Sequence, residues 1–283
     1  MAHPLQRQAE IVELSPVGGY HRLVLRAEGI AERVLPGHFV AVAVGGPDSA
    51  TLLRRSFFIH RADPAAGTIE TVFAERGRGT RELARNRPGD TLDIVAPLGN
   101  AFPVPNGPVS ALLVAGGYGS VPMFALADLI RAQGGSVGFI LGAATGDRLF
   151  GVEEARALTP DVLVTTDDGS AGIRGQVTLP LTEAMRAIEA GVVYACGPMD
   201  MLEAVAQTAT AVGVRCFTAV EEAMACGVGV CMTCVLPVVG DDGVSRFARA
   251  CVEGPCFDGS RVRWDDVGTI PADIEGAAAM GVH

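Results

Sequence analysis

The chain has 283 residues, of which 49% are hydrophobic and 19% are charged. This composition is typical of a folded protein of about two domains and disfavours a disordered chain. Because 32 acidic residues outnumber 22 basic ones, the net charge is −10, which disfavours a nucleic-acid partner and an anionic membrane surface.

No apolar run in the sequence approaches the ~18 residues that a membrane-spanning helix requires. The first ten residues contain no apolar segment of the kind found in secretory signals. We therefore expect a cytoplasmic protein without a membrane partner. Its seven cysteines would stay reduced in the cytoplasm. In that compartment, clustered thiols bind metal or carry out redox chemistry more often than they form disulfides.

The first region, residues 1–103, alternates apolar and polar residues over short segments that are separated by turn sequences. Six such segments at close spacing predict a closed antiparallel β-barrel. One helix is predicted within the barrel at 79–90, with Thr80 as its N-cap. The strands are expected over 6–14, 21–29, 38–46, 54–62, 68–76 and 90–99.

The second region, residues 104–220, has apolar runs of strand length that alternate with helical stretches. Strands that are apolar on both faces and joined by helices predict a doubly wound parallel α/β domain, whose ligands bind at the carboxyl ends of the strands. The strands are expected over 111–117, 137–145, 161–169, 191–197 and 215–222, and the helices over 121–135, 151–158, 178–191 and 198–213.

The third region, residues 221–283, is a small module with five of the seven cysteines. The spacing Cys226-x4-Cys231-x2-Cys234, with a further cysteine downstream, is the plant-type [2Fe–2S] arrangement. Two glycines inside this loop let it curl and bring backbone N–H groups near the sulfur atoms. Both Cys251 and Cys256 follow at a distance suited to a fourth ligand.

A structural zinc site is the main alternative for these cysteines. Zinc ribbons usually pair their thiols as two C-x2-C halves, whereas three cysteines lie close together here and the fourth is distant. The iron–sulfur interpretation is therefore favoured, and a zinc-stabilised scaffold without catalytic activity is the remote alternative. Cys216, in a predicted strand, is interpreted as a small buried residue.

Two other groups of residues are candidates for binding anions or nucleotides. Arg55 lies at a strand end and Gly79 lies at a helix start. The Arg55 guanidinium and the free N–H groups of the helix start would favour phosphate. A surface arginine and an ordinary helix cap explain the two residues equally well. Asp167 and Asp168 lie at the carboxyl end of the third strand of the second region. They would repel a 2′-phosphate and accept ribose hydroxyls, which favours NAD over NADP; a solvated turn is the alternative.

The order of these motifs resembles the ferredoxin–NADP reductase superfamily. RRSFFI followed by GRGT is similar to its R-x-Y-S and G-x-G-T flavin motifs, LLVAGGYGSVPM resembles its G-G-x-G-x-x-P turn, and YACGPMDML resembles its C-G-P-x-x-M motif. Together with MACGVGVCMTCVLPV and ACVEGPCFD, the order resembles the family of electron-transfer subunits of dihydroorotate dehydrogenase B (NAD⁺) over nearly the entire chain.

This resemblance implies that the barrel binds FAD. The chain departs from the family pattern at Phe58, where a serine near the flavin N5 is expected, and Phe57 is equally compatible with the barrel core. The implied flavin contacts are Arg55, Ser56, Phe57 and Phe58, the backbone of Val72, Phe73 and Ala74, and, at the pyrophosphate, Gly79 and Thr80.

The resemblance also implies that the parallel sheet binds NAD, with Cys196 facing the nicotinamide; a buried strand cysteine is the alternative. The glycines expected to permit close approach of the dinucleotide are Gly116, Gly117 and Gly119. They do not form a G-x-G-x-x-G fingerprint, and an ordinary tight turn would also explain them. The implied cluster ligands are Cys226, Cys231, Cys234 and Cys251, which leaves Cys256 as a buried residue.

The function implied by the resemblance is electron transfer in pyrimidine biosynthesis. Dihydroorotate would be oxidised at FMN in a separate catalytic subunit, within a heterotetramer, and electrons would pass through [2Fe–2S] and FAD in this chain to NAD⁺. The alternative within the superfamily is a flavin and iron–sulfur NAD(P)H reductase subunit of a hydrogenase, a sulfide dehydrogenase or a ferredoxin-dependent transhydrogenase.

Overall fold

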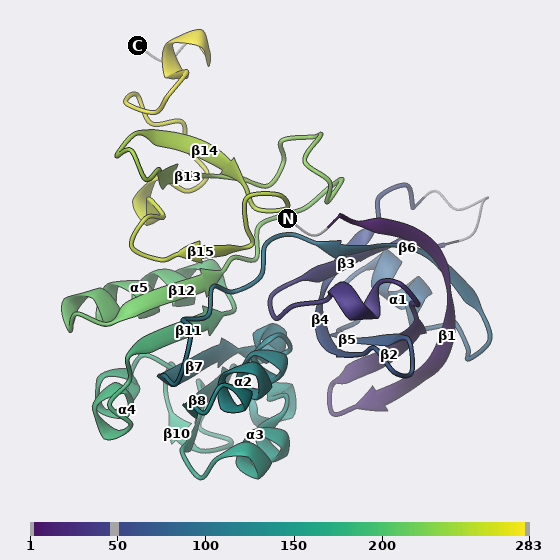
Figure 1. The fold of residues 1–283 in the computed structure, drawn as a ribbon, viewed down its shortest axis with the longest axis horizontal. Coiled ribbons are helices and arrows are strands. Elements are labelled where there is room, and N and C mark those ends of the chain that lie inside the picture. Colours follow the sequence, from purple (N-terminus) through teal and green to yellow (C-terminus); the bar gives the residue numbers. More distant parts are fainter. Residues whose placement is uncertain (1–2, 46–50, 281–283) are drawn as a thin grey trace.

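The computed structural model describes residues 3–45 and 51–280, which form three parts in chain order (Figure 1). A β-barrel is followed by a sheet flanked by helices, and a small module with a hairpin comes last. The first two residues of the predicted barrel domain, the last position of the strand predicted over 38–46, and residues 281–283 of the predicted module lie outside the described residues.

The first part is a closed barrel of six strands in the order β1-β2-β5-β4-β3-β6, and every neighbouring pair is antiparallel. Alternate side chains of these strands, such as Ile11, Leu23 and Ile94, are fully buried inside it. The predicted antiparallel barrel is therefore confirmed. Its strands are β1 (Leu5–Val17), β2 (Tyr20–Arg26), β3 (Phe39–Val42), β4 (Arg55–Asp63), β5 (Thr68–Phe73) and β6 (Thr91–Leu98).

The helix in the barrel, α1 (Arg78–Leu83), is shorter than the one predicted, and Thr80 is not its N-cap. Gly77 takes that position with an extended backbone. The Thr80 hydroxyl oxygen reaches back from the third helical position and accepts hydrogen bonds from the N–H groups of Arg76 (2.9 Å) and Gly77 (3.1 Å). Thr80 therefore caps the helix from inside its first turn.

The second part is a seven-stranded sheet in the order β10-β9-β8-β7-β11-β12-β15. All pairs are parallel except the last, so the predicted doubly wound parallel domain is confirmed. Chain order reverses between β7 and β11, which is where ligands of such sheets bind. The parallel strands are β7 (Ser110–Gly116), β8 (Ser136–Ala143), β9 (Val162–Thr166), β10 (Ile173–Arg174), β11 (Val192–Cys196) and β12 (Arg215–Ala219).

Helices cover both faces of this sheet because its strands are apolar on both sides. Leu113 and Phe139 pack with α2 on one face, and Leu112 and Ile140 pack with α4 and α5 on the other. The α-helices are α2 (Met123–Ala132), α3 (Val152–Leu158), α4 (Leu181–Ala187) and α5 (Met199–Ala211). The 3-10 helices are η1 (Ala31–Arg33), η2 (Gly117–Ser120), η3 (Gly146–Arg148), η4 (Trp264–Asp266) and η5 (Ala277–Met280).

The third part is attached to the sheet by a strand that the sequence did not predict. β15 (Cys256–Asp258) pairs antiparallel with β12, and the chain between them forms the cysteine loop and the hairpin of β13 (Val235–Val239) and β14 (Ser245–Arg249). The Glu275 N–H donates to the Ser245 carbonyl oxygen at 2.8 Å, so part of the C-terminal tail packs on this hairpin. Among the described residues, no helix has the length and apolar character needed to cross a bilayer.

Buried side chains join the barrel to the sheet. Tyr20 of β2 packs edge-on against Tyr118 and Phe150, with ring centroids 6.4 and 6.0 Å apart. The buried His60 of β4 bonds through Nδ1 to the Val121 carbonyl oxygen at 2.9 Å. These contacts hold the barrel against the segment that follows β7.

We predict that His38 makes folding sensitive to acid. Burial lowers the pKa of His38 to about 4 from an ordinary 6.5, and its Nδ1 accepts the Leu35 N–H at 3.0 Å. Since the unfolded chain binds this proton more readily, the free energy of unfolding should fall below pH 6.5, by up to about 1.4 kcal/mol per pH unit, until pH 4.

Urea denaturation between pH 7 and 5 measures this slope. His38→Gln should flatten it, whereas the exposed His3→Gln, which also removes one imidazole, should keep the wild-type slope. Equal slopes for all three proteins would contradict the prediction.

Candidate functional site

Two cavities lie beside each other at the junction of barrel and sheet, and Tyr118 and Glu221 line both. The barrel cavity, of about 460 Å³, is bounded on the barrel side by residues 53–58 and Val72. The sheet cavity, of about 610 Å³, lies over the carboxyl ends of β7, β8 and β9 and includes Gly116, Gly117 and Thr165. A ligand in one cavity would therefore border a ligand in the other.

The barrel cavity has a basic edge formed by Arg55. A Cβ atom on Gly79 would lie 2.8 Å from Arg55 Nε, so the absence of a side chain lets the guanidinium rest on the first turn of α1. The structure thus brings together Arg55 and Gly79, both of which the sequence predicted to contact phosphate, and a guanidinium beside free N–H groups suits that anion. The Thr80 hydroxyl, in contrast, is engaged with the turn before the helix.

The residues after Arg55 divide between two environments because β4 alternates its side chains. Phe57 packs on the barrel core, with its ring centroid 5.5 Å from that of Phe73, whereas Phe58 packs on the clusters of the sheet domain. Both also line the barrel cavity, as Ser56 and Val72 do. An apolar wall of this kind fits the flat, largely apolar ring system of a flavin.

The two residues that follow Val72 do not line the barrel cavity with the others. The Phe73 side chain is buried inside the barrel, so it can offer a ligand only its backbone, which is the contact that the sequence predicts. Ala74 is half-buried and packs on the sheet-domain cluster.

The predicted glycines lie at the switch point of the sheet. Gly117 has a φ of +58°, and a Cβ atom on Gly119 would lie 2.4 Å from the Cys196 carbonyl oxygen. Gly116 packs in the same way against Pro198, and it lines the sheet cavity with Gly117. These glycines bring the ends of β7 and β11 into close contact and leave backbone accessible to a ligand.

Cys196 lies at this point too, but its side chain is fully buried and lines neither cavity. Burial raises the pKa of the Cys196 thiol well above its ordinary value, so the thiol is neutral at physiological pH. A role for Cys196 beside the nicotinamide stays a prediction. The buried side chain agrees with the alternative, which is a strand cysteine that packs in the core.

The two predicted aspartates separate. Asp167 lines the sheet cavity, but Asp168 does not. The Asp168 carboxylate accepts hydrogen bonds from the Ser170 N–H (2.9 Å) and hydroxyl (2.6 Å), which lower its pKa. Near Asp167, the buried Thr165 Oγ1 has no hydrogen-bond partner in the part of the chain that the structure describes. A carboxylate and an unpartnered hydroxyl are suited to the hydroxyl groups of a nucleotide ribose.

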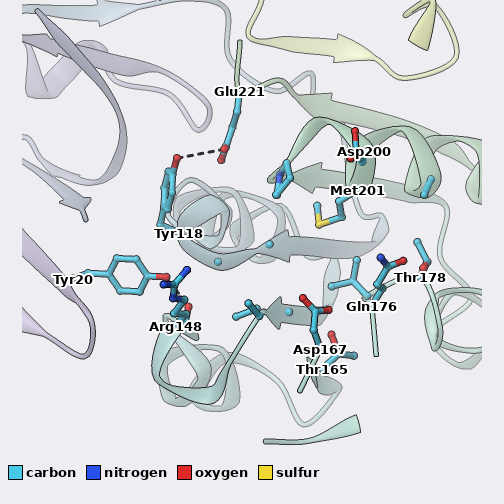
Figure 2. A pocket seen from close by; sticks show the side chains of 18 of the residues that line it. Tyr20, Tyr118, Arg148, Thr165, Asp167, Gln176, Thr178, Asp200, Met201 and Glu221 are labelled. Carbon is cyan, nitrogen blue, oxygen red and sulfur yellow. Dashed lines mark hydrogen bonds between the residues drawn. The ribbon is translucent and has the colours of Figure 1, made fainter. Parts of the chain in front are cut away.

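Two residues that the sequence did not single out, Tyr118 and Glu221, line both cavities, and Figure 2 shows their side chains pointing toward each other. The Tyr118 hydroxyl donates to Glu221 Oε2 at 3.4 Å, and the second Glu221 oxygen is buried and has no partner within residues 3–45 and 51–280. Burial raises the pKa of Tyr118 to about 12 and also raises that of Glu221. Tyr118 directly follows the strand predicted over 111–117, and Glu221 lies at the end of the strand predicted over 215–222. That position at the carboxyl end of a sheet was the signal available.

The cysteine loop is shaped around the sulfur of Cys226, which accepts three backbone N–H groups at 3.4 to 3.5 Å. Hydrogen bonds with Thr233 lower the pKa of the exposed Cys231 to about 6. Cys234 and Cys251 are buried neighbours. The pKa of Cys251 is raised to about 12, mainly by burial and also by its hydrogen bond with Cys234.

The Arg249 guanidinium donates to the Gly229 carbonyl oxygen at 3.1 Å, which joins the loop to the segment that carries the fourth thiol. Among the described residues no three Cys, His, Asp or Glu side chains already form a metal-binding set. The donor set and the N–H groups around its first sulfur fit an iron–sulfur cluster.

This loop lies beside the barrel cavity. Met224, two residues before Cys226, lines that cavity, and a Cβ atom on Gly227 would lie 3.6 Å from Ser56 Oγ. The three sites are therefore adjacent in space. A cluster on the loop would lie next to a ligand in the barrel cavity, which would in turn lie next to a nucleotide in the sheet cavity. This order defines the class of iron–sulfur oxidoreductases built on the ferredoxin–NADP reductase fold.

Comparison with known proteins identifies the family. Residues 221–263 match the iron–sulfur cluster binding domain of dihydroorotate dehydrogenase B. The electron transfer subunit of dihydroorotate dehydrogenase B (NAD⁺) from Bacillus caldolyticus is 38% identical over 244 residues, which cover 86% of this chain and 92% of that one. The corresponding subunit from Geobacillus sp. (strain WCH70) is 35% identical over 91% of this chain and 98% of its own length. The chain belongs to this family of electron-transfer subunits.

Solved structures agree with the fold. An NADH-dependent reduced ferredoxin–NADP oxidoreductase, described for flavin-based electron bifurcation, matches with a TM-score of 0.80 and 28% identity over 97% of this chain and 96% of that chain. A ferredoxin reductase of carbazole 1,9a-dioxygenase matches with a TM-score of 0.62 and 20% identity over 75% of this chain and 67% of that one. The expected oxidoreductase function and the cofactors [2Fe–2S], FAD and NAD are confirmed by family and fold, and the residue assignments stay predictions.

We predict that Cys231→Ser abolishes the cluster but not flavin binding. The substitution removes a thiol on the exposed side of the loop, whereas Arg55 and Gly79 are in the barrel. Iron, acid-labile sulfide and the visible absorbance of the cluster should be lost, with FAD retained at the wild-type ratio. Cys256→Ser, at a buried thiol, is the matched control and should keep both cofactors. Loss of FAD together with the cluster in Cys231→Ser would show that the two sites are not separate.

Proposed function

We propose that this chain passes electrons from dihydroorotate, oxidised at FMN in a separate catalytic subunit, through its [2Fe–2S] cluster and FAD to NAD⁺. The observation that carries the proposal is the contiguity of the cysteine loop, the barrel cavity and the sheet cavity around Tyr118 and Glu221. The curated relatives, which are named as the electron transfer subunit of such an enzyme, support it.

A flavin exchanges hydride with nicotinamides and single electrons with iron–sulfur clusters, so it converts two-electron into one-electron transfer. The residues of this chain bind and separate the reactants. Arg55 holds phosphate beside Gly79, and Phe57 and Phe58 exclude water from one side of the barrel cavity. Glu221 is half-buried, and one of its oxygens is buried without a hydrogen-bond partner among the described residues, so it presents a hydrogen-bonding group where the two cavities adjoin.

The surface of the cysteine loop supports a catalytic partner at this place. Val230 is 79% exposed, Met232 51% and Val228 45%, and all three flank the predicted cluster ligands. Exposed apolar side chains next to a redox centre favour a protein partner that covers them. We propose that this partner is the FMN-carrying subunit and that the two chains assemble as a heterotetramer. A cytoplasmic location follows from the same proposal, because the cysteine thiols must stay reduced to bind iron.

A second candidate function is an NAD(P)H reductase subunit of a ferredoxin-dependent transhydrogenase. The match to the NADH-dependent reduced ferredoxin–NADP oxidoreductase favours it, since 97% of this chain is covered. Only the partner subunit would differ, because both functions use the same cavities.

Co-purification from the native host followed by two assays separates these candidates. The proposed function predicts that the chain co-purifies with an FMN-containing dihydroorotate dehydrogenase, that dihydroorotate reduces NAD⁺ only when both subunits are present, and that reduced ferredoxin does not replace dihydroorotate. Reduction of NAD⁺ by ferredoxin with a different partner, and none by dihydroorotate, would contradict it and support the transhydrogenase.

We predict a preference for NADH over NADPH that depends on Asp167. A 2′-phosphate beside this carboxylate would be repelled, so flavin reduction by NADH should be at least about tenfold faster than by NADPH. Asp167→Ser should lower the ratio of the NADH rate to the NADPH rate. Asp168→Ser should leave this ratio unchanged, because the Asp168 carboxylate lies outside the cavity and is bonded to Ser170. Stopped-flow flavin reduction measures both rates, and equal rates in the wild type would refute the assignment.

A further inference from the structure

Two arginines that neither the motifs nor the family comparison singles out lie in the sheet cavity. Arg76 follows β5 of the barrel, and Arg148 ends η3 of the sheet domain, so the two come from different domains. Both are exposed, and neither takes part in an ion pair among the described residues. Their charges are therefore available to a ligand.

Tyr20 brings the two arginines to the same end of the cavity. Its hydroxyl donates to the Arg148 carbonyl oxygen at 2.6 Å, and Figure 2 shows the two residues side by side. The Arg76 guanidinium lies over the Tyr118 ring, 5.1 Å from its centroid, and Tyr118 in turn packs on Tyr20. Both guanidinium groups act electrostatically on the Tyr20 phenol. The Tyr118 ring of this aromatic pair therefore contacts the Arg76 guanidinium, and the Tyr20 hydroxyl anchors the backbone of Arg148.

The other charges of the cavity decide what these arginines bind. Its remaining charged lining residues are the carboxylates Asp167, Asp200 and Glu221. A nicotinamide dinucleotide carries its negative charge on the diphosphate, which would be repelled near these groups and attracted by guanidinium groups. The backbone of Gly116 and Gly117 lines the same cavity and permits close approach.

We propose that Arg76 and Arg148 clamp the diphosphate of the nicotinamide dinucleotide between the two domains, with Tyr20 as the residue that positions Arg148. The inference rests on the proposed NAD-linked function and assigns its phosphate subsite. It means that neither domain alone forms the complete nucleotide site.

Binding of ADP-ribose, which has the diphosphate but no nicotinamide, tests the clamp without turnover. Isothermal titration of the full chain with its cofactors should show a Kd about tenfold or more higher in Arg76→Gln and in Arg148→Gln, because each loses a charge-assisted hydrogen bond. Arg131→Gln, which removes an equal charge from α2 outside both cavities, should bind like the wild type. Tyr20→Phe should raise KM for NADH with little change in kcat.

An unchanged Kd in both cavity variants, with tight binding by the wild type, would overturn the clamp and leave the proposed function intact. An equal loss in Arg131→Gln would also overturn it, since the effect would then come from net charge. If Arg76→Gln lost FAD, Arg148→Gln in the other domain would decide alone. Failure of the wild type to bind ADP-ribose or NADH would overturn the proposed function as well.

Discussion

The pairing of β15 with β12 is the constraint on which the arrangement of the redox sites depends. The chain leaves the sheet after Ala219, and it returns at Cys256, which lies opposite Ala219 in the sheet. The Val220 N–H donates to the Pro255 carbonyl oxygen at 2.9 Å and closes this excursion. Because both ends are fixed at the sheet edge, Glu221 must lie at the cavities and the cysteine loop must return alongside the barrel. A three-residue strand thereby sets the position of the iron–sulfur module relative to the other two parts.

The contacts at the switch point complete this geometry. Gly119 fits against the Cys196 carbonyl oxygen, so the ends of β7 and β11 meet and Tyr118 is directed toward the barrel. Tyr20 reaches across from the barrel to the same tyrosine. The result is one junction at which two cavities share a wall, with the cysteine loop at the edge of one of them. Electron transfer requires short distances between cofactors, and cofactors bound in these adjoining cavities and on the loop beside them would lie close together.

The sequence predicted the elements that repeat a strong pattern and missed those that depend on distant partners. Alternating strands identified the barrel, and doubly apolar strands identified the parallel sheet. β15 has three residues, and its pairing partner lies far back in the chain, so no local pattern could indicate it. Likewise, Tyr118, Arg76 and Arg148 resemble ordinary surface residues until the fold places them around one cavity. The sequence favours Thr80 as the N-cap because a hydroxyl at a helix start usually has that role, whereas in the structure the hydroxyl acts from inside the first turn.

Electron paramagnetic resonance of the anaerobic protein after addition of NADH tests the central claim most directly, namely that the cavities and the cysteine loop form one continuous route for electrons. The account predicts that NADH alone reduces the flavin and produces the signal of the reduced [2Fe–2S] cluster in the wild type. It would be contradicted if NADH bleached the flavin while the cluster stayed oxidised and yet dithionite reduced it, because the cluster would then be present but not connected to the flavin.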